Sequence, residues 1–217
     1  MGQAGMAEAA VRYLRSVRTA AEPVEALPRP DLRCVGADER APLDPREFRR
    51  VLGSFATGVA VVTAPAATAG EPPAGFACQS FTSLSLDPPL VAFMVGRTST
   101  TWPRIARAGV FCVNVLGSRQ GELCRAFAVS GADKFAGVAY DAAPASGSPR
   151  LTGAVAWIDC AIHAVHTGGD HLVVVGRVNA LGTEDAAGSD GPLLFHRGRF
   201  ARLADPAEGS SGRQPPQ

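Results

Sequence analysis

The feature that most constrains the fold of this chain is a series of short, valine-rich apolar segments separated by glycine and proline clusters. Three of these segments read GVAVVTA (58–64), LVAFMV (90–95) and VFCVNVL (110–116). Runs of this length and composition, bounded by turn residues, are typical of β-strands. The two continuous apolar runs, 90–95 and 110–116, indicate strands buried on both faces. The segment 74–81 (AGFACQSF) is expected to form a hairpin with 58–64.

The rest of the pattern extends the same architecture. Two long strands are predicted around the turn TGGD (167–170), and a final hairpin is predicted over 192–203 with Arg197-Gly198 at its turn. Short helices are expected after Pro45, after Trp102 and after Ser118. Six or more strands joined mostly by turns predict a mainly β fold, a closed antiparallel barrel with a few short peripheral helices. The chain lacks a G-x-G-x-x-G motif after a first strand, which argues against a Rossmann domain.

Composition divides the chain into three parts. Residues 1–43 form an extension whose segment 7–21 (AEAAVRYLRSVRTAA) has the spacing of a short helix, followed by a proline-rich linker. The arginine-rich start of this extension is compatible with an organelle transit peptide, a partner-docking tail or a plain surface extension. Residues 44–204 are the expected folded domain, and residues 205–217 are expected to be a disordered tail.

The folded domain opens with a helix signal, DPREFRRVLGSF (44–55). Asp44 stands at the N-cap position, Pro45 at the first helical position, and Glu47 three residues on completes a capping box. The apolar residues of this segment fall on one helical face: Phe48, Val51, Leu52 and Phe55.

Charge and cysteine content limit the class of partner and the compartment. The formal net charge is +1, so no nucleic-acid or membrane-surface partner is expected. The five cysteines are odd in number and widely spaced, which indicates reduced thiols that act as small core residues in the cytoplasm. No apolar run approaches the about 20 residues of a membrane span, and no secretory signal is visible.

Nucleophilic and metal-dependent chemistry find little support. The sequence has no G-x-S-x-G elbow and no cysteine in an activating context. His163 and His166 are three residues apart on a predicted strand, so they point to opposite faces and cannot chelate one metal together. No metal site is predicted.

Hydroxyl groups and glycines form the more informative clusters. The stretch GFACQSFTSLSLDPPL (75–90) begins as a strand and then exchanges apolar alternation for hydroxyls. In RTSTTW (97–102), hydroxyls precede a predicted helix and suit either an anion site or ordinary N-capping. In GGDH (168–171), Asp170 and His171 lie at a strand-to-strand turn, where they form either part of a rim or a simple surface hairpin.

In this order and spacing, the segments resemble the flavin-reductase-like family of short-chain NAD(P)H:flavin oxidoreductases. The resemblance covers residues 45–203 and rests on FRRVLGSFATGVAVVTA, GFACQSFTSLSLDPPL, FCVNVL, DKFAG, GDHLVVVGRV and PLLFHRGRF. It is strongest to the reductases paired with aromatic-ring hydroxylases.

The resemblance implies a split β-barrel of the FMN-binding type that forms a homodimer. It further implies that NADH or NADPH reduces FMN or FAD, and that the reduced flavin passes to a separate oxygenase. NADH is favoured because the sequence has no obvious arginine cluster for a 2′-phosphate. Hydride transfer between these cofactors is their own chemistry, so the chain must mainly bind and orient them.

The resemblance also assigns site residues. Those expected along the flavin ring are Ala77, Cys78, Gln79, Ser80, Ser83, Leu84 and Ser85, with Ser80 and Ser83 in direct side-chain contact. Those expected at the ribityl phosphate are Ser99, Thr100 and Thr101, and those ending a strand beside the flavin are Asn114 and Leu116. Lys134 and Phe135 are expected at the phosphate or adenine end. His171, the expected catalytic residue, lies with Gly169 and Asp170 where nicotinamide stacks, and Phe195 and Arg197 border the same mouth.

Two alternatives share this fold. A split-barrel flavoprotein can hold its flavin tightly and act directly on a substrate, and a non-enzymatic module can bind flavin or haem. The GDH segment at the rim argues against the second, because a binding module does not need to admit nicotinamide. The sequence also departs from the family pattern at Gln79 and at 196–198, and the resemblance does not extend to residues 1–43.

Overall fold

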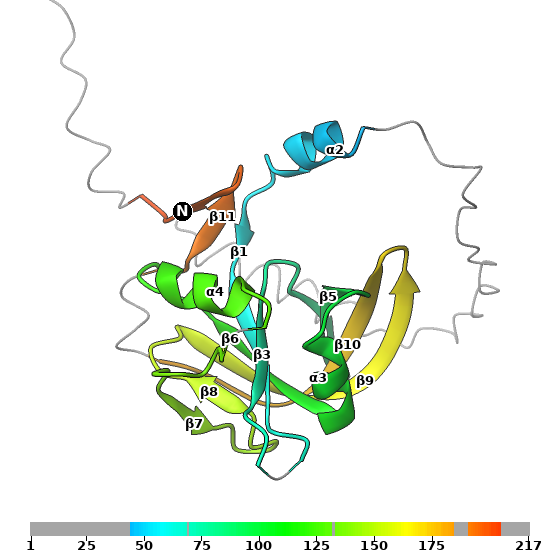
Figure 1. The fold of residues 1–217 in the computed structure, drawn as a ribbon, viewed down its shortest axis with the longest axis vertical. Helices are drawn as coiled ribbons and strands as arrows, with labels where there is room; N and C mark the ends of the chain where they lie inside the picture. The colour runs from blue at the N-terminus through cyan, green and yellow to red at the C-terminus, as the bar shows by residue number, and fades with distance from the viewer. Residues whose placement is uncertain (1–43, 69, 132, 185–190, 205–217) are drawn as a thin grey trace, which may run out of the picture. The chain divides into compact units, whose positions relative to one another are not determined.

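The computed structural model describes residues 44–68, 70–131, 133–184 and 191–204. The expected helix over 7–21 and the tail 205–217 lie outside these residues. The predicted mainly β character is confirmed, with a few short helices at the periphery (Figure 1).

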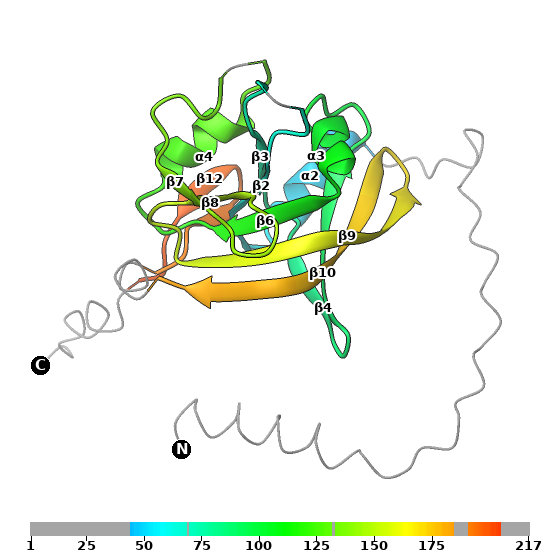
Figure 2. The same ribbon diagram turned by 90° about the horizontal axis from the view of Figure 1, so that it is seen from below.

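A seven-stranded antiparallel sheet forms the body, in the order β3-β2-β6-β9-β10-β5-β4. Its strands are β2 (Ala60–Ala64), β3 (Ala74–Cys78), β4 (Thr82–Leu86), β5 (Pro89–Gly96), β6 (Val110–Val115), β9 (Ala156–Gly168) and β10 (His171–Thr183). The predicted β2–β3 hairpin is confirmed, with Val62 opposite Phe76. So is the long β9–β10 hairpin, which Figure 2 shows as a two-stranded ribbon along one side of the body.

Smaller elements surround this sheet. Three short strands pair in the order β1-β11-β12, with bounds β1 (Thr57–Gly58), β11 (Leu194–His196) and β12 (Arg199–Ala201). Two more, β7 (Tyr140–Ala142) and β8 (Pro149–Leu151), form a separate hairpin. The helices are α2 (Pro45–Leu52), α3 (Trp102–Ala108) and α4 (Gly121–Ala128).

The chain connectivity forces the large sheet to curl. β3 and β4 lie at opposite edges of the seven strands, yet only residues 79–81 connect them. An extended chain covers at most about 3.6 Å per residue, so the Cα atoms of Cys78 and Thr82 are no more than about 14 Å apart. The two edges of the sheet must therefore approach each other.

The approaching edges do not join into a ladder, so the prediction of a closed barrel is wrong. β4 pairs with the first half of β5, as Thr82 opposite Ala92 shows, and among the described residues no strand pairs with the outer edge of β3. A single side chain bridges the remaining gap. The Ser80 hydroxyl accepts a hydrogen bond from Met94 N at 2.9 Å and donates one to Met94 O at 3.0 Å.

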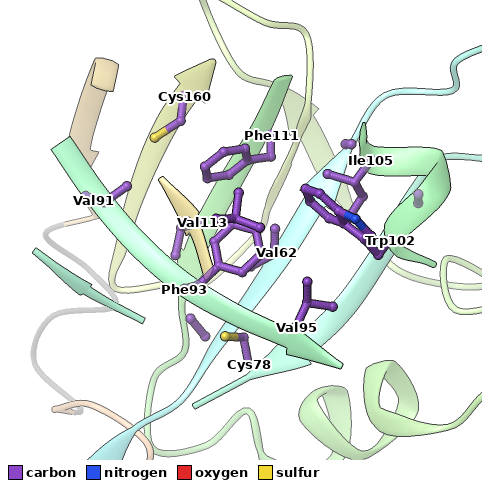
Figure 3. Packing of buried hydrophobic residues seen from close by; sticks show 14 residues of the cluster. Val62, Cys78, Val91, Phe93, Val95, Trp102, Ile105, Phe111, Val113 and Cys160 are labelled. Atoms are coloured by element: carbon purple, nitrogen blue, oxygen red, sulfur yellow. The ribbon is translucent and has the colours of Figure 1, made fainter. Parts of the chain in front are cut away.

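Aromatic rings fill the interior of the curled sheet. Phe93 of β5 packs edge-on against Phe111 of β6 at 5.2 Å and against Trp102 of α3 at 6.2 Å between ring centroids (Figure 3). Gly176 of β10 leaves room for this packing, because a Cβ atom there would lie 2.3 Å from Phe111 Cζ. The four cysteines among the described residues are buried free thiols, as predicted.

One buried amide links three strands across the body. Asn114 Nδ2 lies 3.2 Å from Val61 O, 3.1 Å from Thr63 Oγ1 and 3.3 Å from Pro149 O. Its Oδ1 accepts a hydrogen bond from Leu151 N at 2.7 Å. Because a buried polar group without partners is costly, this saturated amide fixes β8 on β2 and β6.

Helix α2 begins as predicted but packs differently. The Asp44 carboxylate accepts a hydrogen bond from Arg46 N, as an N-cap does. Glu47 forms no capping box, because its carboxylate pairs with Arg50 at 2.6 Å instead. No residue of α2 is buried, and its apolar face is in contact with solvent: Phe48, Val51 and Leu52 are 52–54% exposed and Phe55 78%. Among the described residues, no helix is long and apolar enough to span a membrane.

The Ser80 bridge leads to a stability prediction. Replacing Ser80 with alanine should reduce the free energy of unfolding by about 1 kcal/mol, because Met94 N and O lose their only bridge to the opposite edge. Ser83→Ala is the matched control, since Ser83 is an exposed neighbour whose hydroxyl makes no hydrogen bond among the described residues. Urea unfolding of the two variants measures the difference. Equal stabilities would contradict a structural role for the bridge.

Candidate functional site

A cavity of about 500 Å³ lies where the two sheet edges fail to join. β3 and the second half of β5 form two of its walls, the loop 97–101 and the end of α4 form the others, and His171 lies at its rim. Its lining residues are Phe76, Ala77, Cys78, Gln79, Ser80, Met94, Val95, Gly96, Thr98, Ser99, Thr100, Thr101, Phe127, Ala128, Ser130, Lys134 and His171.

The β3 wall offers backbone groups more than side chains. β3 is an edge strand, so its outer backbone groups face the gap. The Ser80 hydroxyl is occupied by Met94, and the Cys78 thiol lies 3.3 Å from the same oxygen. Burial raises the pKa of the Cys78 thiol, which keeps it protonated and unsuited to nucleophilic attack. Ala77, Cys78 and Gln79 thus contribute shape and main-chain donors and acceptors.

The loop before α3 provides hydroxyls at another wall. Ser99 Oγ accepts a hydrogen bond from Trp102 N at 3.2 Å, so for this residue the N-capping interpretation holds. Thr101 is the N-cap residue by position, but its side chain makes no capping bond. The hydroxyls of Thr100 and Thr101 therefore remain available to the cavity.

His171 is held at the rim by two neighbours. Its Nδ1 atom is 2.7 Å from Asp170 Oδ1, and this hydrogen bond, with the histidine charge as a second cause, lowers the pKa of Asp170. In the sheet register His171 lies opposite Gly96 of β5. A Cβ atom built on Gly96 would lie 3.9 Å from His171 Nε2, so the glycine leaves that nitrogen uncovered.

Lys134 provides a positive charge at the far end. Its Nζ atom donates to Gly75 O at 3.2 Å and to Phe127 O at 3.1 Å, which ties the loop to β3 and α4. Burial, with the charge of Arg104 as a smaller cause, lowers the pKa of Lys134. Lys134 also lines an adjoining cavity of about 210 Å³ together with Arg104 and Phe135. The main cavity therefore adjoins a recess whose charged lining residues are Arg104, Lys134 and Asp133.

The structure brings together nine of the predicted site residues in the main cavity, and Phe135 in the recess. It does not bring the others there. Ser83, Leu84 and Ser85 belong to β4 and line none of these cavities, and Asn114 and Leu116 are completely buried. We therefore do not assign these five residues to the site. Ser80 keeps its place in the lining, but its hydroxyl serves Met94 rather than standing free for a ligand.

The residues predicted for the mouth are separated. Gly169 and Asp170 form the β9–β10 turn beside His171 without lining the cavity, and Gly169 has φ 68°. Phe195 lines a neighbouring cavity of about 230 Å³ that shares Ala77, Cys78 and Gln79 with the main one. Arg197 lines a different cavity, next to α2.

Several lining residues carried no signal in the sequence. Met94, Val95 and Gly96 end an apolar strand, and Phe127, Ala128 and Ser130 end a helix with an ordinary apolar face. Their common position follows from the curl of the sheet. The glycine at position 75 of the strand was the one sequence signal for the close approach of α4 to β3. A Cβ atom there would lie 2.7 Å from Phe127 Cε1 and would separate α4 from β3.

The arrangement as a whole fits a planar polar ring with an anionic tail. An edge strand offers main-chain groups along one side, the hydroxyls and Lys134 lie towards one end, and His171 lies at the open rim. A volume of about 500 Å³ is in the range of cofactor sites.

Comparison with known proteins agrees with this geometry. The sequence model of the protein family described as flavin reductase like domain matches residues 52–204, which are more than half of the chain. The chain is 48% identical over 168 residues to the reductase subunit HsaB of a flavin-dependent monooxygenase from Rhodococcus jostii, covering 77% of this chain and 83% of that protein.

Two solved structures are also similar. Nitrilotriacetate monooxygenase component B from Mycobacterium thermoresistibile has a TM-score of 0.69 and 43% identity, covering 78% of this chain and 90% of that chain. The NADH:FAD oxidoreductase SgcE6 of Streptomyces globisporus, solved with NAD and FAD fragments, has a TM-score of 0.68 and 38% identity, covering 77% and 99%. The chain therefore belongs to the flavin reductase like domain family.

Proposed function

We propose that this protein is an NAD(P)H:flavin oxidoreductase that reduces loosely held FMN or FAD and supplies the reduced flavin to a separate flavin-dependent oxygenase. The observation that carries the proposal is the cavity between β3 and β5, with His171 at its rim, in a chain of the flavin reductase like family. The relatives include a monooxygenase reductase subunit and an NADH:FAD oxidoreductase, which supports NADH as the electron donor.

The flavin would lie along β3. The edge backbone of Ala77–Gln79 would meet the polar side of the ring system, where donors stabilise negative charge on a reduced flavin. Thr100, Thr101 and Lys134 would hold the phosphate, and Arg104 and Phe135 in the adjoining recess would accept the larger FAD. When bound, flavin and nicotinamide supply the redox chemistry themselves.

The role of the chain at the rim is orientation. Asp170 fixes the ring of His171 through Nδ1, and Nε2 is left facing the space over Gly96. A hydrogen bond from Nε2 to the nicotinamide carboxamide would hold the substrate ring over the flavin. His171 would thus act as the catalytic residue by positioning, while Phe195 borders the adjoining hollow.

The anchoring suits a flavin that leaves. The main cavity offers hydroxyls, backbone groups and one lysine, and Lys134 already donates to two carbonyls. This is a weaker hold than a bidentate arginine clamp on the phosphate would be. Buried free thiols at the four described cysteines support a reducing, cytoplasmic location.

The fold of this domain is best described as a split barrel. The three-residue link between edge strands β3 and β4 supports it, as does the Ser80 bridge that replaces a ladder between β3 and β5. The split is also what keeps the cavity open, because a closed ladder would place paired backbone where the ligand is proposed to lie.

We further propose that the domain forms a homodimer through α2. An eight-residue helix is too short to be stable in water by itself, and the apolar face of α2 is uncovered. Figure 1 shows α2 beyond the end of β1, away from β6 and α3. Leu84 and Leu86 of edge strand β4 are also exposed, by 54% and 85%. A second copy of the chain would cover these apolar surfaces.

The dimer proposal predicts the effect of one charge. Val51→Glu should convert the protein from a dimer to a monomer, because it places a carboxylate in the apolar face of α2. Val51→Leu is the control, since it keeps the face apolar. Light scattering during size-exclusion chromatography measures the mass of each variant. A wild-type monomer, or a dimer that persists in Val51→Glu, would contradict the proposal.

Steady-state kinetics test the function itself. The wild-type protein should oxidise NADH only when FMN, FAD or riboflavin is added, and the purified protein should lack the stoichiometric flavin absorbance near 450 nm that a tightly held flavin gives. His171→Ala should raise the KM for NADH or lower kcat about tenfold or more, while the Kd for flavin stays within about twofold.

His166→Ala is the matched control, because His166 is an exposed histidine on β9 that lines none of the cavities. Its kinetics should equal those of the wild type. If His171→Ala behaves like His166→Ala, His171 is not part of the site. Absence of NADH oxidation with every flavin would remove the reductase assignment.

A further inference from the structure

A second cavity, of about 550 Å³, lies between α2 and the β11–β12 turn, and none of its lining residues lines the candidate flavin site. Every lining residue is a glycine or polar: Arg46, Arg49, Arg50, Gly53, Ser54, Arg197 and Gly198. Four of the seven are arginines, which come from two separate elements of the chain. The cavity therefore adds the distant Arg197 to three arginines that are already close together on α2.

Most of this charge has no counter-charge in the protein. Glu47 neutralises Arg50 through an ion pair at 2.6 Å. Among the described residues, no carboxylate pairs with Arg46, Arg49 or Arg197. All four arginines are exposed to solvent, and together they make this concave surface positively charged and suited to an anion.

The positions of the arginines are not explained by helix stability alone. Arg49 and Arg50 lie in the last turn of α2, where cations offset the helix dipole. Arg46 lies in the first turn, where a cation is unfavourable, and Arg197 is not on the helix. The spacing 46, 49, 50 places three arginines on one helical face, opposite the exposed apolar face.

The backbone brings Arg197 to this cavity at a conformational cost. Arg197 and Gly198 form a two-residue turn with φ 48° and 76°, and Arg197 is the only described non-glycine residue with positive φ. Such a turn favours Asn-Gly, so the arginine is better explained by its side chain than by the turn. Arg197 N also donates to Gly53 O at 2.9 Å, which fixes the turn against the end of α2.

We propose that this arginine cavity binds the diphosphate group of a small molecule, such as a nucleoside diphosphate moiety. Arginine forks match the geometry of phosphate oxygens, the Ser54 hydroxyl adds a donor, and Gly53 and Gly198 allow close approach to the backbone. The lining side chains are those of four arginines and one serine, so every polar group that they present can donate a hydrogen bond to an anion. Sequence patterns do not predict this cavity, because Arg197 joins the three arginines of α2 only through the β11–β12 turn.

Isothermal titration calorimetry of the full chain with pyrophosphate, with ADP and with uncharged adenosine tests the proposal. Pyrophosphate and ADP should bind, adenosine should not bind to the cavity, and affinity should fall as salt rises. The double variant Arg49→Gln/Arg197→Asn should lose at least about tenfold in affinity for pyrophosphate. Asparagine tolerates the positive φ of the turn, so this loss will not reflect a distorted hairpin.

Arg107→Gln is the charge control, because Arg107 is exposed on α3 and lines none of the cavities. It should leave pyrophosphate affinity unchanged. Pyrophosphate binding that is absent in the wild type, or equal in the wild type and the double variant, would overturn the proposal. Binding of poly-glutamate without pyrophosphate would also overturn it and would assign the surface to an acidic protein.

The source of the diphosphate is resolved by kinetics. A raised KM for NADH in the double variant would show that the cavity serves the nicotinamide nucleotide, and an unchanged KM with lost pyrophosphate binding would show that it serves a separate ligand. Either result supports the site. The calorimetric readout needs neither flavin nor turnover, so failure of the reductase assignment and failure of this proposal are distinguishable.

Discussion

The structure depends on the three-residue connection between β3 and β4. Strands at opposite edges of a seven-stranded sheet can be joined by residues 79–81 only if the sheet curls until the edges meet. The curl creates an interior, which Phe93, Phe111 and Trp102 fill. It also creates a seam between β3 and β5. The Ser80 hydroxyl bridges this seam at Met94, and beyond the bridge the seam opens into the candidate site.

The connection between β3 and β4 also accounts for the hydroxyl residues that interrupt the apolar strand pattern in residues 75–90. A ladder across the seam would satisfy the backbone and exclude a ligand. One serine satisfies the backbone of Met94 locally, and the remaining edge of β3 stays available. His171 reaches the far side of the seam because the register of β10 on β5 places it opposite Gly96. The residues near the seam therefore contribute both to the stability of the fold and to the proposed binding of flavin.

Sequence patterns predicted the strands well, because period and turn chemistry are local properties. The β2–β3 and β9–β10 hairpins and the Asp44 cap were found in this way. Side-chain direction was harder to predict. Ser80 and Ser83 look alike in the sequence, yet Ser80 turns into the seam and Ser83 lies on the exposed strand β4. Asn114 looked like a ligand contact, but its amide is saturated by hydrogen bonds to strands β2 and β8.

Two kinds of error had a common physical origin. The periodicity of α2 identified an apolar face, but periodicity does not say whether that face meets its own core or another surface. Likewise, Arg46, Arg49 and Arg50 are close in the sequence, but no local pattern links them to Arg197, which the hydrogen bond from Arg197 N to Gly53 O brings to the end of α2. The exposure of the apolar face of α2 and the arginine cavity were both missed because the residues that lie next to them are determined by tertiary structure.

The central claim is that flavin lies in the seam between β3 and β5. Amide hydrogen exchange with and without FMN tests it most directly, because unpaired edge amides exchange quickly until a ligand covers them. The account predicts slower exchange on FMN binding in residues 76–80 and 95–101, with little change in β7, β8 and β12. Protection that is absent from both seam segments, or confined to the arginine cavity next to α2, would contradict it.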